Sequence, residues 1–156
     1  SSGLHTNGYS LVRKVFKLDD DPSPLHTEYV ELEKTLGDAL LEPHRSYVSI
    51  VNDVKKKLKS IAHITGGGLV ENIPRALPDE CAAVLDIASW DVPGLFSLIQ
   101  KTGDIPSNEM FRVFNMGLGM IMVCSQDNVD AVIRQLPDAR IVGKVTSLKE
   151  DQRVIL

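Results

Sequence analysis

Two short segments of the sequence combine a histidine with glycines, and they hold the residue types best suited to bind an anion or to move a proton. The first is SSGLHTNG at residues 1–8, which contains His5 and Asn7. The second is HITGGG at residues 63–68. Histidine titrates near neutral pH, so it can shuttle a proton or bind an anion. Glycine lets a ligand approach the backbone closely and adopts positive φ angles without strain.

The second segment has two interpretations, which the residues alone leave equally open. A strand followed by a glycine turn and a helix start leaves backbone N–H groups pointing outward, which is typical of a phosphate site. Such a site would use Thr65, Gly66, Gly67 and Gly68. The same glycines could instead let a helix pack tightly on a sheet. The turn is not a P-loop, because the GK[ST] ending is missing and Glu71 stands where a lysine would help.

A third glycine-containing segment is FNMGLGM at residues 114–120, where Asn115 precedes two glycines that lead into a strand. These glycines favour either the approach of a ligand or relief of crowding against a neighbouring helix. His5 and His63 also have a second interpretation, as hydrogen-bonded structural histidines. His26 and His44 lie in loop-like surroundings, and the sequence assigns them no role.

Alternating strands and helices must position these segments. Strands are predicted at residues 61–64, 82–87, 117–124, 140–146 and 153–156. Helices are predicted at 9–16 with Asn7 as its cap, between Thr35 and Pro43, along 47–58, and at 93–100, 107–114 and 127–136. This order predicts an α+β domain of layered α/β/α type, with a mixed central sheet and flanking helices. Apolar residues on both faces of 118–123 predict a central strand there.

The composition fits one ordinary domain of 156 residues with a net charge of −4. The negative charge gives no general attraction to nucleic acid or to an anionic membrane, so neither is an expected partner. No apolar stretch is long enough to cross a bilayer, and residues 1–10 lack the features of a signal peptide. Cys81 and Cys124 form neither a zinc spacing nor a CxxC pair, which predicts reduced, buried thiols in a cytoplasmic protein.

Several longer blocks carry a family resemblance. They are SSGLHTNGYSLVRKV, LLEPHRSYV, IAHITGGGLVENIPRALP, the W-x-x-P of residues 90–93, EMFRVFNMGLGM and the closing DQRVIL. With these blocks in this order, the sequence resembles the C-terminal domain of the phosphoribosylformylglycinamidine cyclo-ligases, also called aminoimidazole ribonucleotide synthetases. The resemblance runs from residue 1 to residue 156. It implies the C-terminal domain fold of that superfamily.

The resemblance also implies an activity in purine biosynthesis. Formylglycinamidine ribonucleotide and ATP would give aminoimidazole ribonucleotide, ADP and phosphate, with magnesium. A phosphoryl group would pass to the formyl oxygen, and the amidine nitrogen would then close the ring. His5 and His63 become candidate catalytic residues. The candidate substrate- or phosphate-binding residues are Asn7, Thr65, Gly66, Gly67, Gly68 and Asn115.

One departure from the family pattern is large. Family members are about twice as long, and their N-terminal half supplies most of the ATP and magnesium contacts within a homodimer. Residues 1–156 are therefore expected to be a single substrate-side domain of a longer cytoplasmic enzyme, inactive alone, with the N-terminal ATP-binding domain absent and no magnesium ligand assigned. Two alternatives stay open: a domain that only binds a phosphorylated metabolite, and a kinase-like member of the same superfamily.

Overall fold

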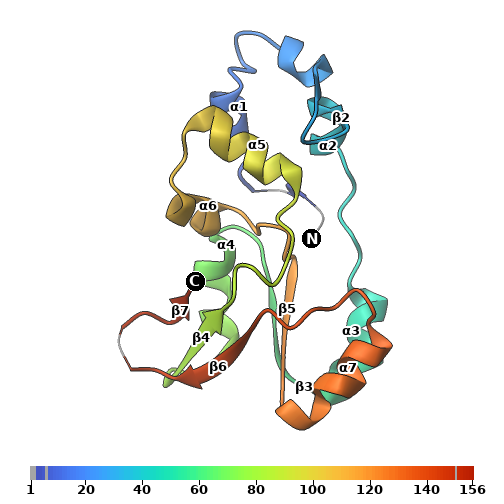
Figure 1. Ribbon diagram of the computed structural model, residues 1–156, viewed down its shortest axis with the longest axis vertical. Helices are drawn as coiled ribbons and strands as arrows, with labels where there is room; N and C mark the ends of the chain where they lie inside the picture. The colour runs from blue at the N-terminus through green and yellow to red at the C-terminus, as the bar shows by residue number, and fades with distance from the viewer. Residues whose placement is uncertain (1–2, 6, 150) are drawn as a thin grey trace.

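The computed structural model describes residues 3–5, 7–149 and 151–156, and its helices and strands form an α+β chain (Figure 1). The helices are α1 (Tyr9–Val15), α2 (Leu36–Leu40), α3 (Val48–Val54), α4 (Gly68–Asn72), α5 (Gly94–Gly103), α6 (Ser107–Val113) and α7 (Val129–Gln135). The strands are β1 (Glu28–Tyr29), β2 (Lys34–Thr35), β3 (Leu58–His63), β4 (Cys81–Leu85), β5 (Met120–Cys124), β6 (Gly143–Ser147) and β7 (Val154–Ile155). Short 3-10 turns are η1 (Ser23–His26), η2 (Lys55–Lys57), η3 (Pro74–Ala76) and η4 (Gln126–Asn128).

The upper part of the molecule in Figure 1 is helical. There α1, α2 and α5 lie together with the small β1–β2 hairpin. Val12, Phe96, Ile99 and Met110 are fully buried in a shared apolar cluster. The i, i+3 spacing of Phe96 and Ile99 on α5 places both on the face that meets this cluster.

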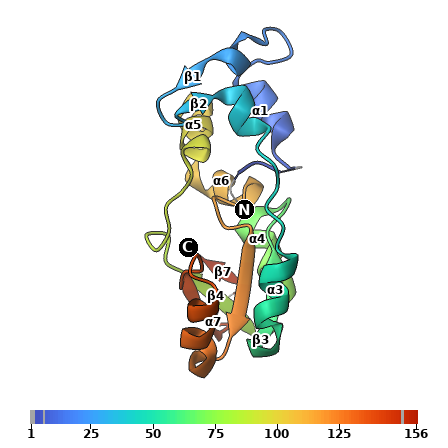
Figure 2. The same ribbon diagram turned by 90° about the vertical axis from the view of Figure 1, so that its right-hand side faces the viewer.

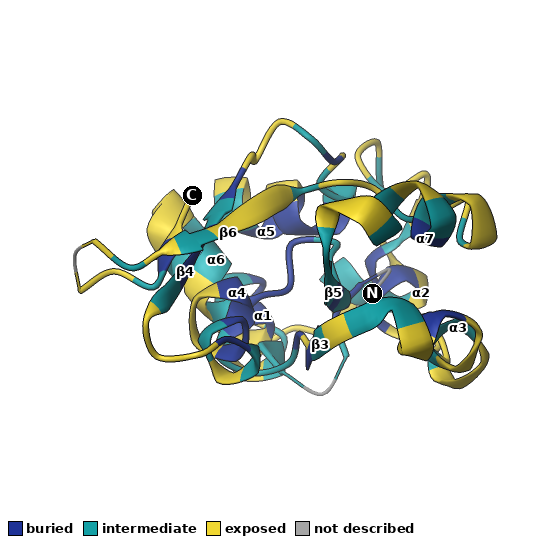
Figure 3. Ribbon diagram, turned by 90° about the horizontal axis from the view of Figure 1, so that it is seen from below, coloured by how far each residue is buried: buried dark blue, intermediate teal, exposed yellow. Residues whose placement is uncertain are grey.

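The lower part of the molecule holds the longer strands (Figures 1 and 2). β3 pairs antiparallel with β5, with His63 opposite Met120. In the second sheet β4 lies between β6, which is antiparallel to it, and β7, which is parallel. A second apolar cluster, which includes Leu69, Ile73 and Trp90, fills the space beside these sheets. In Figure 3 buried stretches lie at α4, β4 and α5, whereas the outer faces of α3 and α7 are exposed.

The α+β class is confirmed, and the mixed pairing is found in the sheet β6-β4-β7. The arrangement differs in one respect, because the longer strands are divided between two sheets. β5, expected at the centre, has β3 as its only strand neighbour within the described residues. Apolar residues on both faces of a strand predict that both faces are buried. They do not predict which edges of the strand are hydrogen-bonded to other strands.

Several element boundaries also differ from the prediction. The helix predicted along residues 47–58 ends at Val54, and Leu58 begins β3 instead. An apolar residue at that position fits both the apolar stripe of a helix and the alternating pattern of a strand, so the apolar pattern does not distinguish the two elements there. Asn7 does not cap α1, whose N-cap is Gly8 with φ +83° and no side-chain cap bond. The cap by Thr35 is confirmed, since its hydroxyl oxygen accepts a hydrogen bond from the Asp38 backbone N–H at 3.1 Å.

Two smaller expectations concern membranes and thiols. Within the described ranges, none of the helices has the length and apolar character needed to span a membrane. Cys81 and Cys124 are free thiols, as predicted, but both are half-buried rather than fully buried. Cys81 is the first residue of β4 and packs against the edge of the lower apolar cluster.

Arg153, in the closing DQRVIL block, holds the turn that precedes β4. Its guanidinium donates hydrogen bonds to the backbone carbonyl oxygens of Pro78 at 2.6 Å, Leu77 at 3.0 Å and Cys81 at 3.3 Å. It also pairs with the exposed carboxylate of Asp79 at 3.4 Å. One side chain therefore ties the segment before β7 to the start of its neighbouring strand.

Replacing Arg153 with methionine is expected to lower the free energy of unfolding by about 1–3 kcal/mol, because charge-assisted hydrogen bonds to partly buried carbonyls are lost. Urea denaturation followed by circular dichroism measures the change. The matched control is Arg140→Met, since Arg140 makes only an exposed pair with Asp91 at 3.5 Å. That variant should change stability by less than about 0.5 kcal/mol. Equal losses in the two variants would contradict this role of Arg153.

Candidate functional site

The two histidine–glycine segments meet in the structure. His5 lies in the segment before α1, and His63 is the last residue of β3. Asn7 lies against the glycine turn, because a Cβ atom added to Gly66 would be 2.9 Å from its Oδ1. A small hollow of about 10 Å³ is lined by Leu4, His5, Asn7, Ile64, Thr65, Phe96, Val113, Phe114 and Asn115. A hollow of this size holds about one water molecule, so a larger ligand would have to bind across its mouth.

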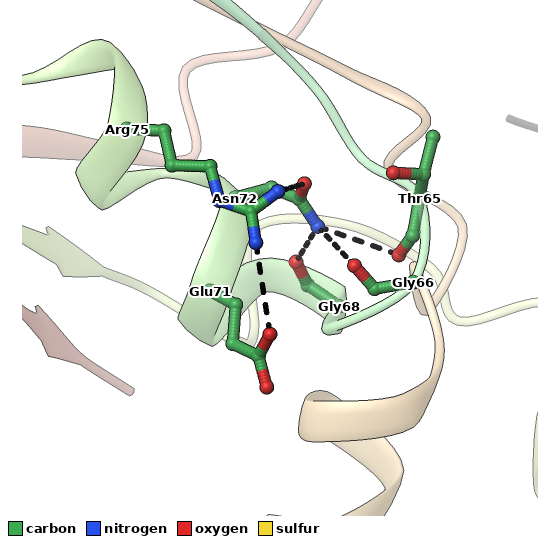
Figure 4. Close-up of polar contacts among 6 residues, drawn as sticks. All are labelled: Thr65, Gly66, Gly68, Glu71, Asn72 and Arg75. Carbon is green, nitrogen blue, oxygen red and sulfur yellow. Dashed lines mark hydrogen bonds and ion pairs between the residues drawn. The ribbon is translucent and has the colours of Figure 1, made fainter.

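A residue that the sequence analysis did not select fixes the glycine turn. The Asn72 side-chain amide donates to the carbonyl oxygens of Gly68 at 2.8 Å, Gly66 at 3.0 Å and Thr65 at 3.4 Å (Figure 4). Asn72 is 5% exposed, and its Oδ1 accepts a bond from Arg75 at 3.4 Å. The turn thus directs three carbonyl oxygens inward onto one buried amide.

The inward carbonyls leave part of the turn available to a ligand. The backbone N–H of Gly68 bonds to the Thr65 carbonyl at 3.1 Å. The N–H groups of Gly66 and Gly67 donate to no other residue in the described part of the chain. Two donors on consecutive residues can bind an oxyanion. The Glu71 carboxylate lies near them, since a Cβ on Gly67 would be 2.5 Å from its Oε2, and Arg75 pairs with that carboxylate at 3.8 Å.

The three glycines do not play one role. Gly68 has φ +56°, and a Cβ there would overlap the carbonyl oxygen of Phe111 and lie 2.8 Å from that of Phe114. Packing of α4 against α6 therefore accounts for this glycine. Gly67 has φ +91° at the N-cap of α4. The three atoms nearest to a Cβ on Gly66 all belong to the side chain of Asn7.

Asn115 connects the first and third segments. Its Nδ2 donates to the Gly3 carbonyl at 2.9 Å, and its Oδ1 accepts from the Gly117 N–H at 2.9 Å. The residue is 9% exposed. Both ends of its amide thus bond to protein groups, and they hold the segment that carries His5 against the loop before β5. Residues 1, 2 and 6 of the first segment lie outside the described residues.

A third histidine joins the two candidate catalytic histidines. The His44 ring is 4.7 Å from the His5 ring and 5.4 Å from the His63 ring, measured between centroids. Its Nε2 is 3.3 Å from Nε2 of His63. The Tyr47 ring lies 5.7 Å from His44 and 6.0 Å from His63. His44 stands in the irregular segment between α2 and α3, where no periodic pattern marks it, so only the tertiary structure reveals its contacts.

The surroundings favour the neutral forms of two of these imidazoles. Partial desolvation of its ring lowers the pKa of His63, and the nearby His44 lowers it further. Burial lowers the pKa of His5, with His44 acting in the same direction and Glu42 opposing both. A neutral imidazole at neutral pH can accept a proton.

The lowered values predict how stability depends on pH. The unfolded chain binds protons at these histidines more tightly than the folded chain does. The free energy of unfolding is therefore highest above pH 6.5, the ordinary histidine pKa, and decreases as the pH falls below that value. We expect urea denaturation to show that the free energy of unfolding decreases more between pH 7.5 and pH 5.5 in the wild type than in His63→Asn. In the control His26→Asn, in the exposed turn η1, it should decrease as much as in the wild type. An identical pH response of all three proteins would refute this.

A wide cavity lies elsewhere in the structure, and its lining contains none of the residues predicted to form the site. In the described ranges, no group of three or more His, Cys, Asp or Glu side chains is placed to hold a metal ion. A cavity of about 1410 Å³ opens between β5, β6 and α7, with Trp90 and Leu118 in its wall. None of the predicted site residues lines it. The residues that could do chemistry therefore gather outside the lining of this cavity, around His63 at the end of β3.

Comparisons with known proteins point to a single protein family. A family model described as "AIR synthase related protein, C-terminal domain" matches residues 1–155. The chain is 49% identical over 160 residues to a phosphoribosylformylglycinamidine cyclo-ligase of Caldicellulosiruptor bescii, covering 100% of this chain and 47% of that protein. It is 49% identical over 143 residues to the one of Caldicellulosiruptor saccharolyticus, with 90% and 42% covered. For Bacillus cytotoxicus the identity is 47% over 150 residues, with 92% and 43% covered. The chain thus spans less than half the length of these relatives.

Proposed function

Because the chain belongs to the family of AIR synthase related proteins, as their C-terminal domain, we propose that it is the substrate-side part of a phosphoribosylformylglycinamidine cyclo-ligase. The observation that carries the proposal is the meeting of His5 and His63 around His44 beside the glycine turn. This brings proton-accepting groups close to backbone donors suited to an oxyanion. The proposed reaction is the ATP-dependent closure of formylglycinamidine ribonucleotide to aminoimidazole ribonucleotide in purine biosynthesis.

The proposed binding residues act on the anionic oxygens of the ribonucleotide. The N–H groups of Gly66 and Gly67 are preorganised by Asn72 and would donate to a phosphate or to the developing oxyanion. The Thr65 hydroxyl and the Asn7 amide lie beside them at the small hollow. The Glu71 carboxylate would repel an anion at this turn, so its pairing with Arg75 is part of the proposed site.

The proposed roles of the other residues follow from their contacts. His63 or His5, whose pKa values are lowered by their surroundings, would accept the proton that the amidine nitrogen loses as the ring closes. Gly68 and Asn115 bond or pack against protein groups, so their proposed contribution is to position the neighbours that meet the substrate.

The cofactors and partners belong to the longer protein. ATP supplies the phosphoryl group in the proposed reaction, and magnesium accompanies it. The family resemblance is the ground for assigning ATP and Mg²⁺ mainly to the N-terminal domain, which is the proposed partner of this one. The assembled enzyme is proposed to be a cytoplasmic homodimer.

The test of the proposal is release of ADP from ATP and formylglycinamidine ribonucleotide, measured with this chain alone and mixed with the N-terminal half of its protein. We expect activity only in the mixture. No turnover from components shown to be folded and associated would remove the proposed reaction. Turnover on thiamine monophosphate or selenide instead, with none on the purine precursor, would replace it by another activity of the superfamily.

A variant of His63 separates proton transfer from binding. In the mixture, His63→Asn is expected to lower kcat at least about 100-fold while KM stays within about threefold, because a positioned general base contributes 10²–10⁴-fold to rate. Steady-state kinetics of ADP release measure both constants. His26→Asn, on the exposed turn η1, should behave as the wild type. A raised KM with an unchanged kcat would assign His63 to substrate positioning.

A further inference from the structure

A hydrogen bond joins one of the candidate catalytic histidines to a residue for which the proposed reaction has no role. Nε2 of His63, the last residue of β3, is 3.3 Å from Nε2 of His44, in the segment between α2 and α3. At this distance, which is at the long end of the hydrogen-bond range, one ring donates an N–H and the other accepts it. Both side chains are exposed, so water and a substrate can reach the pair.

Ring contacts from several segments hold His44 in position for this bond. Its ring lies at 85° to the ring of His63, at 81° to that of Tyr47 and at 64° to that of His5, all in edge-to-face arrangements. The four rings come from the start of the chain, from the segment that leads into α3 and from the end of β3. Rotation of the His44 ring would break these contacts, so its Nε2 stays directed at His63.

The direction of the hydrogen bond decides which of the two rings can act as a base. Each neutral imidazole carries one N–H. The ring that donates through Nε2 has its proton there, so its Nδ1 is unprotonated. The ring that accepts has its proton on Nδ1, and its remaining lone pair is already engaged in the bond. Only the donating ring can therefore take up a further proton without breaking the contact, and Nδ1 of His63 is hydrogen-bonded to no residue in the described part of the chain.

We propose that His44 is a positioning residue, which accepts the hydrogen bond from Nε2 of His63 and so keeps Nδ1 of His63 unprotonated as the base of the reaction. This inference rests on the proposed function and selects His63 from its two candidate histidines. As the ring closes, the N–H bond of the amidine breaks, its electron pair stays on the nitrogen, and the proton forms a new N–H bond on Nδ1 of His63. His44 itself does not contact the substrate in this step.

The same contact supports the imidazolium that this step produces. Protonated His63 donates through Nε2 to the neutral ring of His44, and a charge-assisted hydrogen bond is roughly twice as strong as a neutral one. A second proton on the pair would place two donors face to face, and the presence of His44 accordingly lowers the pKa of His63. Glu42 affects the pKa of His5 but is not among the groups that shift the pKa of His63. The pair therefore holds one added proton, which the exposed His44 ring can pass on to water.

The first measurement is the position of the His63 ring proton in the 156-residue chain, read from the shifts of its two ring nitrogens by NMR at pH 8. We expect the wild type to carry this proton on Nε2. In His44→Phe, which keeps a ring but cannot accept a hydrogen bond, the proton should be distributed over both nitrogens. His44→Gln, whose amide oxygen can accept, should keep the wild-type pattern. The matched control His26→Phe should keep it too. A wild-type proton on Nδ1, or the same pattern in His44→Phe and the wild type, would overturn the proposal.

The second measurement is the rate of ADP release by the mixture with the N-terminal half. We expect His44→Phe to lower kcat about tenfold while KM stays within about threefold, which is the low end of what a hydrogen bond to a charged group contributes, because the pair is exposed. His44→Gln should restore kcat to within about threefold of the wild type. An unchanged kcat in His44→Phe, or a raised KM as its only effect, would contradict the positioning role.

The two measurements separate this inference from the proposed reaction. If the mixture turns over the purine precursor while the ring proton of His63 does not depend on His44, the reaction stands and the inference fails. If the ring proton depends on His44 while the mixture shows no turnover, the hydrogen bond stands as described and the proposed reaction fails.

Discussion

Replacing Gly68 with alanine is expected to destabilise the protein by about 3–5 kcal/mol, which would leave much of it unfolded at 37 °C. The added Cβ would overlap the carbonyl oxygen of Phe111 and lie 2.8 Å from the carbonyl oxygen of Phe114. Both atoms belong to the backbone at the end of α6, so they cannot rotate away as a side chain would. The φ angle of +56° adds strain for any residue with a Cβ. Urea denaturation and the soluble fraction on expression measure the effect.

The control for this prediction lies two residues earlier in the same turn. The atoms nearest to an alanine Cβ at Gly66 belong to the end of the Asn7 side chain rather than to backbone, and Gly66 is not among the residues with positive φ. We expect Gly66→Ala to cost less than about 1 kcal/mol of stability. Equal stability of the two variants would show that α4 and α6 do not approach as closely as described.

Replacing Asn72 with aspartate is expected to lower the free energy of unfolding by about 2–4 kcal/mol at pH 7. The change keeps the shape of the side chain but replaces an N–H donor by an acceptor. The three carbonyl oxygens of Thr65, Gly66 and Gly68 would then face a carboxylate (Figure 4). The loss should shrink as pH falls, because the introduced carboxyl group can donate one hydrogen bond once it is protonated.

Urea denaturation at pH 7 and pH 5 checks both parts of this prediction. The control is Asn52→Asp, because Asn52 is exposed and its side chain accepts only from the Lys55 ammonium at 3.0 Å. That variant should change stability by less than about 0.5 kcal/mol at either pH. A loss at residue 72 that is no larger than the one at residue 52, or that does not depend on pH, would contradict the arrangement in Figure 4.

Local patterns predicted the elements well where one face of an element is buried. The i, i+3, i+4 apolar spacing of residues 129–136 predicted α7, and the Thr35 cap predicted the start of α2. The patterns failed at Leu58, which fits both the helical and the strand spacing of apolar residues. They also failed to predict which strands pair with each other. Pairing depends on segments far apart in the sequence, and no local period encodes it.

The candidate site shows the same division. His5, Asn7, Thr65 and Asn115 were selected from short glycine-rich segments, and the structure places all four around one hollow. Their chemical roles stay predictions until the tests above are made. Asn72 was missed because its three partners precede it within its own turn and helix, where an asparagine gives no particular signal. His44 and Arg153 were missed because their importance arises from contacts with distant segments.

The pairing of β5 also has a bearing on how the protein behaves in concentrated solution. β5 is the apolar sequence MIMVC, and within the described residues only its β3 side is hydrogen-bonded to another strand. Its other side faces the large cavity next to β6, where Lys144 supplies a charge that β5 itself lacks. An apolar strand with one unpaired edge can serve as a template for strands of other molecules. Partial opening of that cavity, by displacement of α7, would make β5 a nucleus for self-association.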